Sequence, residues 1–311
     1  MLLDSAEAFG DEASGYRREL LVHCYRMLGS IDEAEDAVQD AFARAWQGRQ
    51  TFRRSISLRA WLYRIATNVC LNAIEARKRH QVEPDITVSP CPVDLLTGVA
   101  ATETGPEGRY DSHESISLAF LRVLQVLPPR QRAVLILRDV LTFRAAEVAA
   151  LVDMSVPAVN SALQRARAVL RSTYGPQSQP AGTAGARRTN PTDLLERYVR
   201  AWESADLVGL MALLREDAVL AMPPKPMVVG ARHIGDFLAG SIFAMGPMRL
   251  LEVEANGDSA FAAYLQQPAD NRLVLFSLLV LTSDWCQITR IDAFTDPRVL
   301  ARFELPLESA T

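Results

Sequence analysis

Two separated segments of this 311-residue chain carry apolar residues at helical spacing. In residues 30–80, and again in residues 127–171, the apolar positions recur every three or four residues, while turn-forming residues are confined to the joints. Such spacing puts one apolar stripe along each helix, and that stripe must be buried against another helix. The pattern therefore predicts two all-helical groups in the first half of the chain.

Two stretches that are poor in periodic apolar residues divide the chain into parts. Residues 81–114 contain four prolines and seven acidic residues against one base, so we expect an acidic linker. Residues 175–191 contain three prolines and three glycines, so we expect a flexible linker. Three folded parts remain, at residues 16–80, 115–174 and 192–311.

Charge is distributed unevenly along the chain, whose formal net charge is -4. Residues 192–311 hold 10 Lys and Arg against 16 Asp and Glu, which leaves the preceding residues with a small positive net charge. Asp32–Asp40 has five acids and no base, whereas Arg49–His80 has eight bases and one acid. Nucleic-acid binding needs local positive potential, and this chain has it only in patches.

The composition excludes several classes of protein. With 49% hydrophobic and 23% charged residues, it is typical of a globular protein. The longest strongly apolar run, Leu273–Leu281, is too short to cross a bilayer, and the N-terminal residues lack a secretory signal pattern, so we expect a cytoplasmic protein without membrane association. Four scattered cysteines are expected to be buried free thiols, with no disulfide, metal or cofactor: Cys24, Cys70, Cys91 and Cys286.

The third part mixes helices and strands. Asp193–Leu214 has the spacing of a broken pair of helices, and Gly230–Gly240 indicates a further short helix. Strand-like runs follow at 248–255, 259–267, 272–282 and 286–294. Asn256-Gly257 joins the first two runs and is a strong signal for a two-residue hairpin turn. The expected fold of this part is α+β.

An acidic helix opens the first group. Ser30 and Glu33 form a capping box at its start, where early acidic residues also meet the positive end of the helix dipole. The apolar face is expected to hold Val38, Phe42, Ala45 and Trp46. Another face is expected to hold Asp32, Asp36, Gln39 and Asp40. Such a face is typical of a solvated helix, so its function depends on the motifs around it.

A basic helix with aromatic residues follows from Leu58 to about Arg79. Opening a DNA duplex requires cations that hold phosphates and a platform or pocket that accepts an unstacked base. The loop before the helix and the helix itself supply candidate DNA-binding residues, namely Arg53, Arg54, Ser55, Arg64, Arg77, Lys78 and Arg79. Trp61 lies on the apolar stripe and is expected in the core, whereas Tyr63 and Thr67 are expected to point elsewhere.

The second group has the pattern of a helix-turn-helix. Asp153 in the turn can adopt a left-handed conformation, Ser155 is a good N-cap, and Pro157 suits the first turn of the last helix. The buried face of that helix is expected to hold Val156, Val159, Leu163, Ala166, Leu170 and Tyr174. Its outer face is expected to present Asn160, Ser161, Gln164 and Arg165, with Arg167 and Arg171 further along. These side chains are suited to reading base edges in the major groove.

In their order and spacing, these motifs resemble the promoter-reading domains of an extracytoplasmic-function (ECF) sigma factor of the sigma-70 family. The AEDAVQ run resembles the segment that docks on the β′ coiled coil of core RNA polymerase, so Asp36, Gln39 and Asp40 would bind there. The resemblance places melting of the minus-ten element in the basic helix and the loop at 53–57. LPPRQRAVLILR resembles region four, which implies reading of the minus-thirty-five element and contact with the β-flap. This resemblance covers residues 16–174.

Residues 192–311 resemble the SnoaL-like, or NTF2-like, cone domain. Its presence after these helices resembles the mycobacterial sigma G group, which implies a domain that modulates sigma activity in place of a separate anti-sigma factor. Candidate lining residues of a pocket for a small hydrophobic ligand are Trp202, Met222, Tyr264 and Phe276. No feature identifies an anti-sigma partner.

The cone fold also houses isomerases and cyclases that work with a pocket Asp and Tyr. Tyr198, Asp217, His233 and Tyr264 could face a cavity, but none falls in a motif that identifies a catalytic base, so we expect no enzyme activity. Two alternatives to a sigma factor stay open: a stand-alone helix-turn-helix regulator, and a cone-domain enzyme with accessory DNA-binding helices. Only a sigma factor requires binding to core polymerase.

Overall fold

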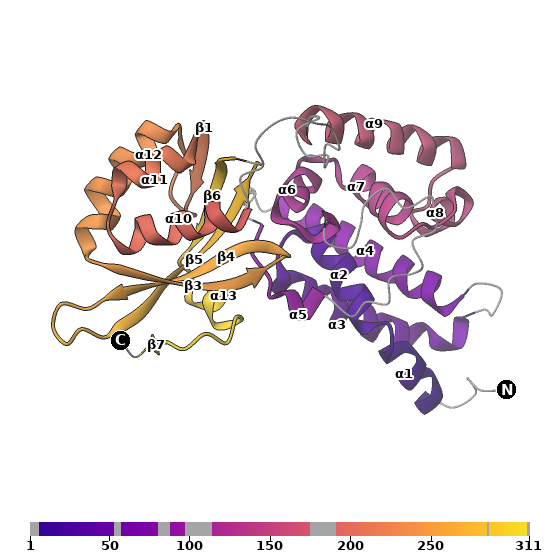
Figure 1. Cartoon of the computed structure of the whole chain (residues 1–311). Helices are drawn as coiled ribbons and strands as arrows, with labels where there is room; N and C mark the ends of the chain where they lie inside the picture. The colour runs from indigo at the N-terminus through magenta and orange to yellow at the C-terminus, as the bar shows by residue number, and fades with distance from the viewer. Residues whose placement is uncertain are drawn as a thin grey trace. The chain divides into compact units, whose positions relative to one another are not determined.

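The computed structural model describes residues 6–52, 57–79, 88–96, 114–174, 191–284 and 286–309. The chain divides into two compact units, Met1–Pro176 and Gln177–Thr311 (Figure 1). Each unit has its own buried apolar residues.

The described part of the first unit is helical (Figure 1). The first group of helices comprises α1 (Ala6–Ser14), α2 (Arg17–Leu28), α3 (Ile31–Gly48), the short turn η1 (Arg49–Thr51) and α4 (Leu58–Arg79). Two short pieces, α5 (Val93–Leu96) and η2 (Glu114–Ile116), precede the second group. That group comprises α6 (Leu118–Val126), α7 (Pro129–Leu135), the π-helical turn η3 (Ile136–Val140), α8 (Ala145–Leu151) and α9 (Val156–Tyr174).

The ends of α2 and α3 follow the local chemistry of the sequence. Gly29 ends α2 with a left-handed backbone (φ 77°), which glycine adopts without a steric penalty. Ser30 caps α3, because its side chain accepts a hydrogen bond from the Glu33 N–H at 3.4 Å. The described part of the expected acidic linker is packed, since the Tyr25 hydroxyl donates to the Ser89 carbonyl at 2.5 Å.

α8 and α9 form the predicted helix-turn-helix. Asp153 has the expected left-handed backbone (φ 54°), and Ser155 accepts a hydrogen bond from the Ala158 N–H at 3.3 Å. In the described parts of the chain, no single helix has both the length and the apolar composition needed to cross a membrane; only the bent pair of α8 and Val156–Ser172 meets that test when taken together.

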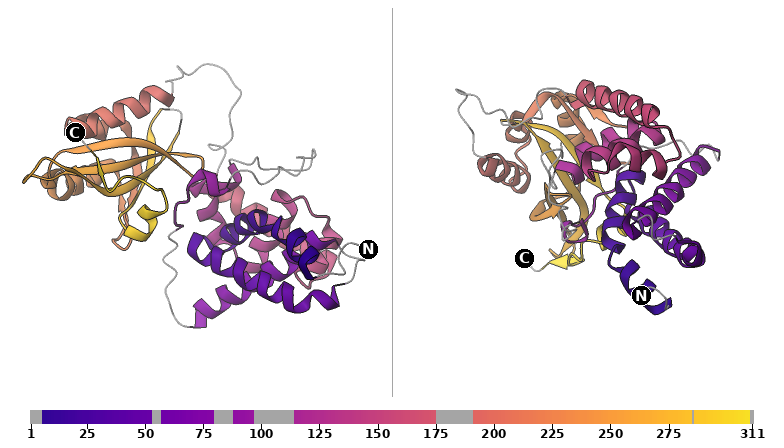
Figure 2. Two further views of the ribbon diagram at one scale, coloured as in Figure 1. Left: turned by 90° about the horizontal axis from the view of Figure 1, so that it is seen from below. Right: turned by 90° about the vertical axis from the view of Figure 1, so that its right-hand side faces the viewer.

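The second unit combines helices with a curled, mostly antiparallel sheet (Figure 2). Its helical pieces are α10 (Pro191–Glu203), α11 (Leu207–Leu213), α12 (Ala231–Phe237), η5 (Leu238–Ile242), η6 (Phe243–Met245) and α13 (Pro297–Ala301). Its strands are β1 (Leu214–Ala221), β2 (Val228–Val229), β3 (Met248–Ala255), β4 (Asp258–Gln266), β5 (Leu273–Ser283), β6 (Ile288–Phe294) and β7 (Glu308–Ser309). The four long strands expected from the sequence are β3 to β6, whereas β1, β2 and β7 were not expected.

The strand order is β2-β1-β6-β5-β4-β3, and β7 pairs with β5. β1 and β6 are parallel, and the other pairs are antiparallel. Asn256 and Gly257 both have positive φ (58° and 74°), as the predicted two-residue hairpin between β3 and β4 requires. α10, α11 and α12 share one hydrophobic core with the sheet, and this core surrounds the cavity described below.

Candidate nucleic-acid interface and cavity

The acidic face of α3 (Asp36, Gln39 and Asp40) is exposed to solvent. The opposite side of the helix is packed, with Val38 and Ala45 buried. Asp40 has one weak neighbour, Arg44, at 3.7 Å in an exposed i,i+4 pair. The acidic face is therefore accessible for a cationic partner.

Trp46 departs from the expected apolar face of α3, because 43% of its surface is exposed. Its neighbour Arg49 lies over the ring, with 4.3 Å from the guanidinium carbon to the ring centroid. The Arg49 side chain also donates to the Trp46 carbonyl at 2.7 Å. Trp46 therefore extends the exposed surface of α3.

The candidate cations of α4 differ in their surroundings. Arg64, Lys78 and Arg79 are exposed. Arg77 is half-buried, forms an ion pair with Glu33 and donates to the Leu28 carbonyl at 3.5 Å. Arg77 therefore fastens α4 to the start of α3, which is a role that the sequence pattern did not predict. The expected base-capturing residues Arg53, Arg54 and Ser55 lie outside the described residues.

Aromatic residues join α1, α3 and α4 near the start of α4. Trp61 is half-buried between Phe9 and Phe52, with ring centroids 6.1 and 5.1 Å away. Trp61 thus packs against neighbouring rings, in keeping with its expected place on the apolar stripe. Tyr63 and Thr67 are fully buried, against expectation, because α4 also packs against α7 and α8.

α9 exposes the residues expected to read DNA. Asn160, Ser161, Gln164 and Arg165 are all exposed along its N-terminal half. Val159, Leu163, Ala166 and Leu170 are buried as expected, whereas Val156 is 39% exposed because it lies at the start of the helix. The side chain of Tyr174 lies outside the described residues.

Arg167 is not part of that exposed set. Its guanidinium donates to both carboxylate oxygens of Asp139, with 2.7 Å from Nε to Oδ2. Asp139 is only 2% exposed, so this is a nearly buried ion pair between η3 and α9. The pair fixes the orientation of α9 on its supporting helices. Arg171, by contrast, is exposed.

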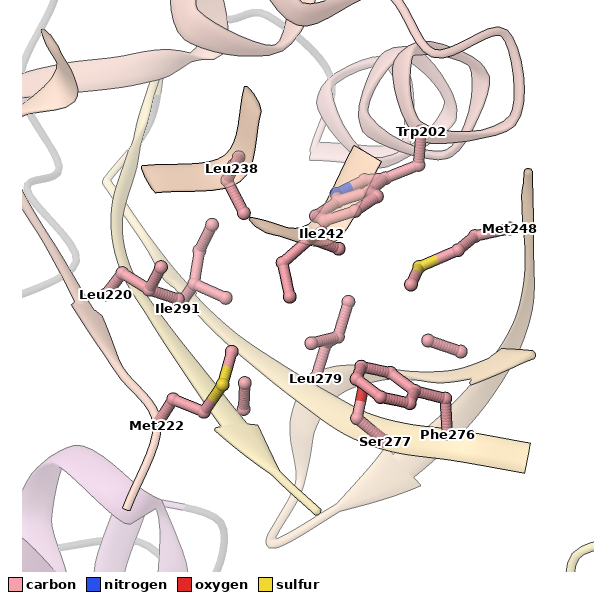
Figure 3. A pocket seen from close by; sticks show the side chains of 12 residues that line it. Trp202, Leu220, Met222, Leu238, Ile242, Met248, Phe276, Ser277, Leu279 and Ile291 are labelled. Atoms are coloured by element: carbon pink, nitrogen blue, oxygen red, sulfur yellow. The ribbon is translucent and has the colours of Figure 1, made fainter. Parts of the chain in front are cut away.

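A cavity opens between the helices and the sheet of the second unit (Figure 3). It contains about 360 Å³ of empty space, its open mouth included. Its lining is almost wholly apolar and consists of Trp202, Leu220, Met222, Leu238, Ile242, Met248, Ala263, Phe276, Ser277, Leu279, Ile291 and Ala293. No carboxylate, imidazole or cationic side chain is among these lining residues.

Three of the four candidate pocket residues, Trp202, Met222 and Phe276, lie on this wall. Tyr264 does not, because side chains alternate along β4 and its neighbour Ala263 faces the cavity. Tyr264 belongs instead to a separate apolar cluster with Ala262 and Leu273. The expectation that Tyr264 lines the pocket is therefore wrong for this cavity.

Besides Ser277 on the wall, two polar side chains lie on the helical side of the cavity: Trp202, which lines it, and Tyr198, whose ring centroid is 6.2 Å from that of Trp202. Burial raises the pKa of the Tyr198 phenol, and the neighbouring Trp202 indole opposes this in part. Neither Trp202 Nε1 nor the Tyr198 hydroxyl has a partner in hydrogen-bond geometry among the described residues. The two other residues considered for catalysis, Asp217 and His233, are exposed and absent from the lining. The wall thus offers Trp202 and Ser277 for hydrogen bonding, and no acid–base pair among its lining residues.

Among the described residues, neither the cysteines nor any group of possible metal-binding side chains forms a further site. Cys24, Cys70 and Cys91 are buried as expected, whereas Cys286 is exposed because it lies in the turn between β5 and β6. Among the residues that the structure describes, no group of three or more His, Cys, Asp or Glu side chains is placed to hold a metal ion.

Three family models match the chain. Sigma-70 region 2 matches residues 13–80, Sigma-70 region 4 matches residues 117–170, and the SnoaL-like domain matches residues 195–291. The first match covers α2–α4, the second covers α6–α8 and most of α9, and the third runs from α10 into β6.

Whole proteins give a consistent result. The chain is similar to the ECF RNA polymerase sigma factor SigG of Mycobacterium tuberculosis, with 37% identity over 96% of this chain and 84% of that protein. It is 29% identical to the ECF RNA polymerase sigma factor SigW of Bacillus subtilis, over 53% of this chain and 88% of that protein. The crystal structure of the M. tuberculosis ECF sigma factor SigJ covers 96% of this chain and 99% of its own, with a TM-score of 0.65 and 22% identity, so its likeness describes the fold.

Proposed function

The chain belongs to the ECF RNA polymerase sigma factors, and from that premise we propose how its parts divide the work of starting transcription. As a sigma factor, it directs core RNA polymerase to specific promoters and initiates DNA-templated transcription there. A match over 96% of the chain to one sigma factor favours this function over the two alternatives, a stand-alone regulator or a cone-domain enzyme. The proposed site of action is the cytoplasm, where the polymerase and the chromosome are.

The acidic face of α3 is the proposed docking site for the β′ coiled coil of core polymerase. Asp36, Gln39 and Asp40 are exposed on one helix, and their side chains are long enough to meet basic residues of a partner. Complementary charge at such an interface speeds association and fixes the register of docking.

Promoter DNA is the proposed partner of α4 and α9. Arg64, Lys78 and Arg79 on α4, together with Arg53, Arg54 and Ser55 in the preceding loop, would hold and open the minus-ten element. Asn160, Ser161, Gln164 and Arg165 on α9 would read the minus-thirty-five element in the major groove. The geometry that supports this division is the exposure of all four α9 residues on a helix whose opposite face is buried. The β-flap of the polymerase is the proposed partner of region 4 (α6–α9).

The second unit is proposed to regulate sigma activity without catalysing a reaction. The observation that carries this proposal is the cavity, which has an apolar wall and lacks an acid–base pair among its lining residues. A small hydrophobic ligand suits such a wall, because burial of apolar surface would drive its binding. The buried Trp202 indole N–H is available to donate one hydrogen bond to an acceptor atom of that ligand.

The test compares the full-length chain with a chain that ends at Gly175. The shorter chain keeps the whole helical unit, and its folding is checked by the cooperativity of thermal unfolding. We expect it to bind core polymerase as the full-length chain does, but to give a different promoter output at equal concentration. Indistinguishable output from the two chains would exclude a regulatory role for the second unit.

A further inference from the structure

The loop Leu141–Arg144, which joins η3 to α8, has a strained backbone. Thr142 has a left-handed conformation (φ 57°), and among the described residues it is the one β-branched residue with positive φ. Such a conformation is unusual for a β-branched side chain, because its Cβ substituents crowd the backbone. Strain of this kind persists only where the surrounding structure holds it, and it is frequent at functional sites.

Arg144, at the end of this loop, occupies the N-cap position of α8. N-caps are usually Ser, Thr, Asp or Asn, because an oxygen of the side chain accepts a hydrogen bond from the first turn of the helix. A guanidinium has only donors, and its charge is unfavourable at the positive end of a helix. Glu147 compensates in part, since its carboxylate accepts a hydrogen bond from the Arg144 backbone N–H at 2.7 Å. Arginine at this position therefore costs helix stability, which a function of its side chain would explain.

The backbone beside Arg144 is fixed by hydrogen bonds. The Phe143 N–H donates to the Leu137 carbonyl at 2.9 Å, and the Arg138 guanidinium donates to the Phe143 carbonyl. Phe143 itself is buried. The Arg144 side chain, by contrast, is exposed, and no ion pair joins it to another described residue. A fixed backbone thus presents a guanidinium that is available to a partner outside the chain.

The geometry of the helix-turn-helix puts Arg144 at a distance from α9 that matches the DNA backbone. The axis of α9 is bent by 98° from that of α8. The seven residues of α8 span about 10 Å, so the helix begins about that far from the turn that leads into α9. When a recognition helix lies in the major groove, which is about 12 Å wide, the preceding helix crosses the phosphate backbone at the edge of the groove. The start of α8 then lies beside phosphates.

The arginines of α9 differ from Arg144 in their surroundings. Arg167 is taken up by its ion pair with the buried Asp139. Arg165 lies on the outer face of α9, among the residues proposed to read bases. Arg144 comes from the preceding helix and extends the cationic surface beyond α9. An exposed guanidinium suits a phosphate group, because its planar set of N–H donors can bind two oxygens at once.

We propose that Arg144 binds a backbone phosphate of promoter DNA beside the minus-thirty-five element and thereby positions α9 in the major groove. A phosphate contact carries no sequence information by itself, but it fixes the register and orientation of the recognition helix on the duplex. The strained loop and the missing N-cap oxygen then have one explanation, because both serve to hold a cation where the DNA backbone passes. This inference rests on the proposed reading of that element by α9, and it adds a residue to which the sequence pattern gave no role.

The salt dependence of DNA binding measures this contact. The chain is bound to core polymerase, and its affinity is measured for a promoter fragment recovered by run-off transcription and for a duplex of arbitrary sequence. Arg144→Ser should bind both DNAs about eightfold more weakly than the wild type at about 0.1 M salt. The slope of log affinity against log salt concentration should become shallower by about 0.9, because one phosphate contact fewer releases counterions. Serine also restores a favourable N-cap, so the thermal unfolding temperature should not fall.

Matched variants separate the charge of Arg144 from other effects. Arg144→Lys keeps the charge and should keep the salt slope, whereas Arg197→Ser makes the same change at an exposed arginine of α10 and should leave both affinities unchanged. Gln164→Ala is measured on the same two DNAs, and core binding by co-sedimentation, so a failure of base reading or of polymerase docking is distinguishable from a failure of the phosphate contact. An unchanged slope in folded Arg144→Ser, or weaker binding of the promoter fragment alone, would overturn the proposal.

Discussion

The pKa of His23 depends strongly on the packing around its side chain. It is fully buried in α2, and its Nε2 lies 2.9 Å from the Thr67 hydroxyl of α4. Burial, together with the nearby cations Arg26 and Arg59, lowers the pKa of His23 from 6.5 to about 3. The folded chain therefore holds this imidazole neutral between about pH 3 and pH 6.5, where a free histidine would be mostly charged.

The low pKa of His23 predicts a loss of stability in mild acid. Below pH 6.5 the unfolded chain takes up a proton at His23 and the folded chain does not, so the free energy of unfolding falls as pH falls towards 3. At pH 5 this one group lowers stability by about 2 kcal/mol relative to pH 8. Denaturation with urea from pH 5 to 8 should show a shallower pH dependence for His23→Gln, which keeps a polar neighbour for Thr67. Identical pH dependence of the free energy of unfolding in the wild type and the variant would contradict a low pKa for His23.

Asp139 and Arg167 give a second prediction for single residues. Arg167→Met should destabilise region 4 by about 3–5 kcal/mol, because it leaves the buried Asp139 carboxylate without its cation. Adding Asp139→Asn to that variant should restore part of the loss. Chemical denaturation of both variants is the measurement, with the exposed Arg171→Met as the control. A loss no larger than that of the control would show that the ion pair is unimportant.

Among the helices, α3 carries the proposed attachment to polymerase. Asp36→Arg combined with Asp40→Arg reverses the charge of an exposed face, so it should abolish binding to core polymerase and leave the thermal unfolding temperature nearly unchanged. Glu196→Arg with Glu203→Arg on α10 makes the same change in charge on another exposed helix and serves as the control. Unaltered affinity of the folded α3 variant for core polymerase in a co-sedimentation assay would exclude this face as the docking site.

The outer face of α9 predicts a different result. Gln164→Ala should weaken binding to minus-thirty-five DNA by about 1–3 kcal/mol, because one set of contacts to a base edge is lost. Binding to core polymerase should be unaffected. Ser172→Ala changes another exposed residue further along α9 and serves as the control. Fluorescence anisotropy with labelled promoter DNA measures both; equal affinities for the two variants would count against base reading by Gln164.

Elements whose burial depends on one local face could be predicted from sequence, and elements buried on two sides could not. α9 and the strands β3 to β6 follow their apolar spacing closely. Tyr63 and Thr67 were misassigned because region 4 covers a second face of α4, and periodicity carries no information about that distant partner. The sequence did not predict β1, because this strand follows α11 with no turn between Leu213 and Leu214. The exposed residues of α3 and α9 were found because turns and caps fixed their helical register.

For the candidate sites, sequence identified exposed polar residues better than buried ones. Arg26, Arg132 and Phe143, which join regions 2 and 4, received no role from the sequence, because their partners come from residues that are remote along the chain. Arg132 carried one local signal, since it is a cation directly before the fully buried run Ala133–Leu137. In the cavity, strand alternation excludes Tyr264, a distinction that required the register of β4.

The whole molecule combines a helical unit that carries both sigma regions with a cone-like unit that encloses an apolar cavity. A tether of eighteen residues or fewer keeps the second unit at high local concentration near the first, so weak contacts between them would be sufficient for regulation. The function of the chain as a whole depends on core polymerase, because a sigma factor acts by directing that enzyme to promoters.

Run-off transcription with purified core polymerase tests this central claim most directly. Core enzyme, the full-length chain and fragments of genomic DNA are combined, and the transcripts are mapped to their start sites. We predict discrete transcripts from a subset of fragments, which disappear when the chain is omitted or when it carries Asp36→Arg with Asp40→Arg. A folded wild-type chain that neither binds core polymerase nor yields any specific transcript across the whole set of fragments would contradict the account.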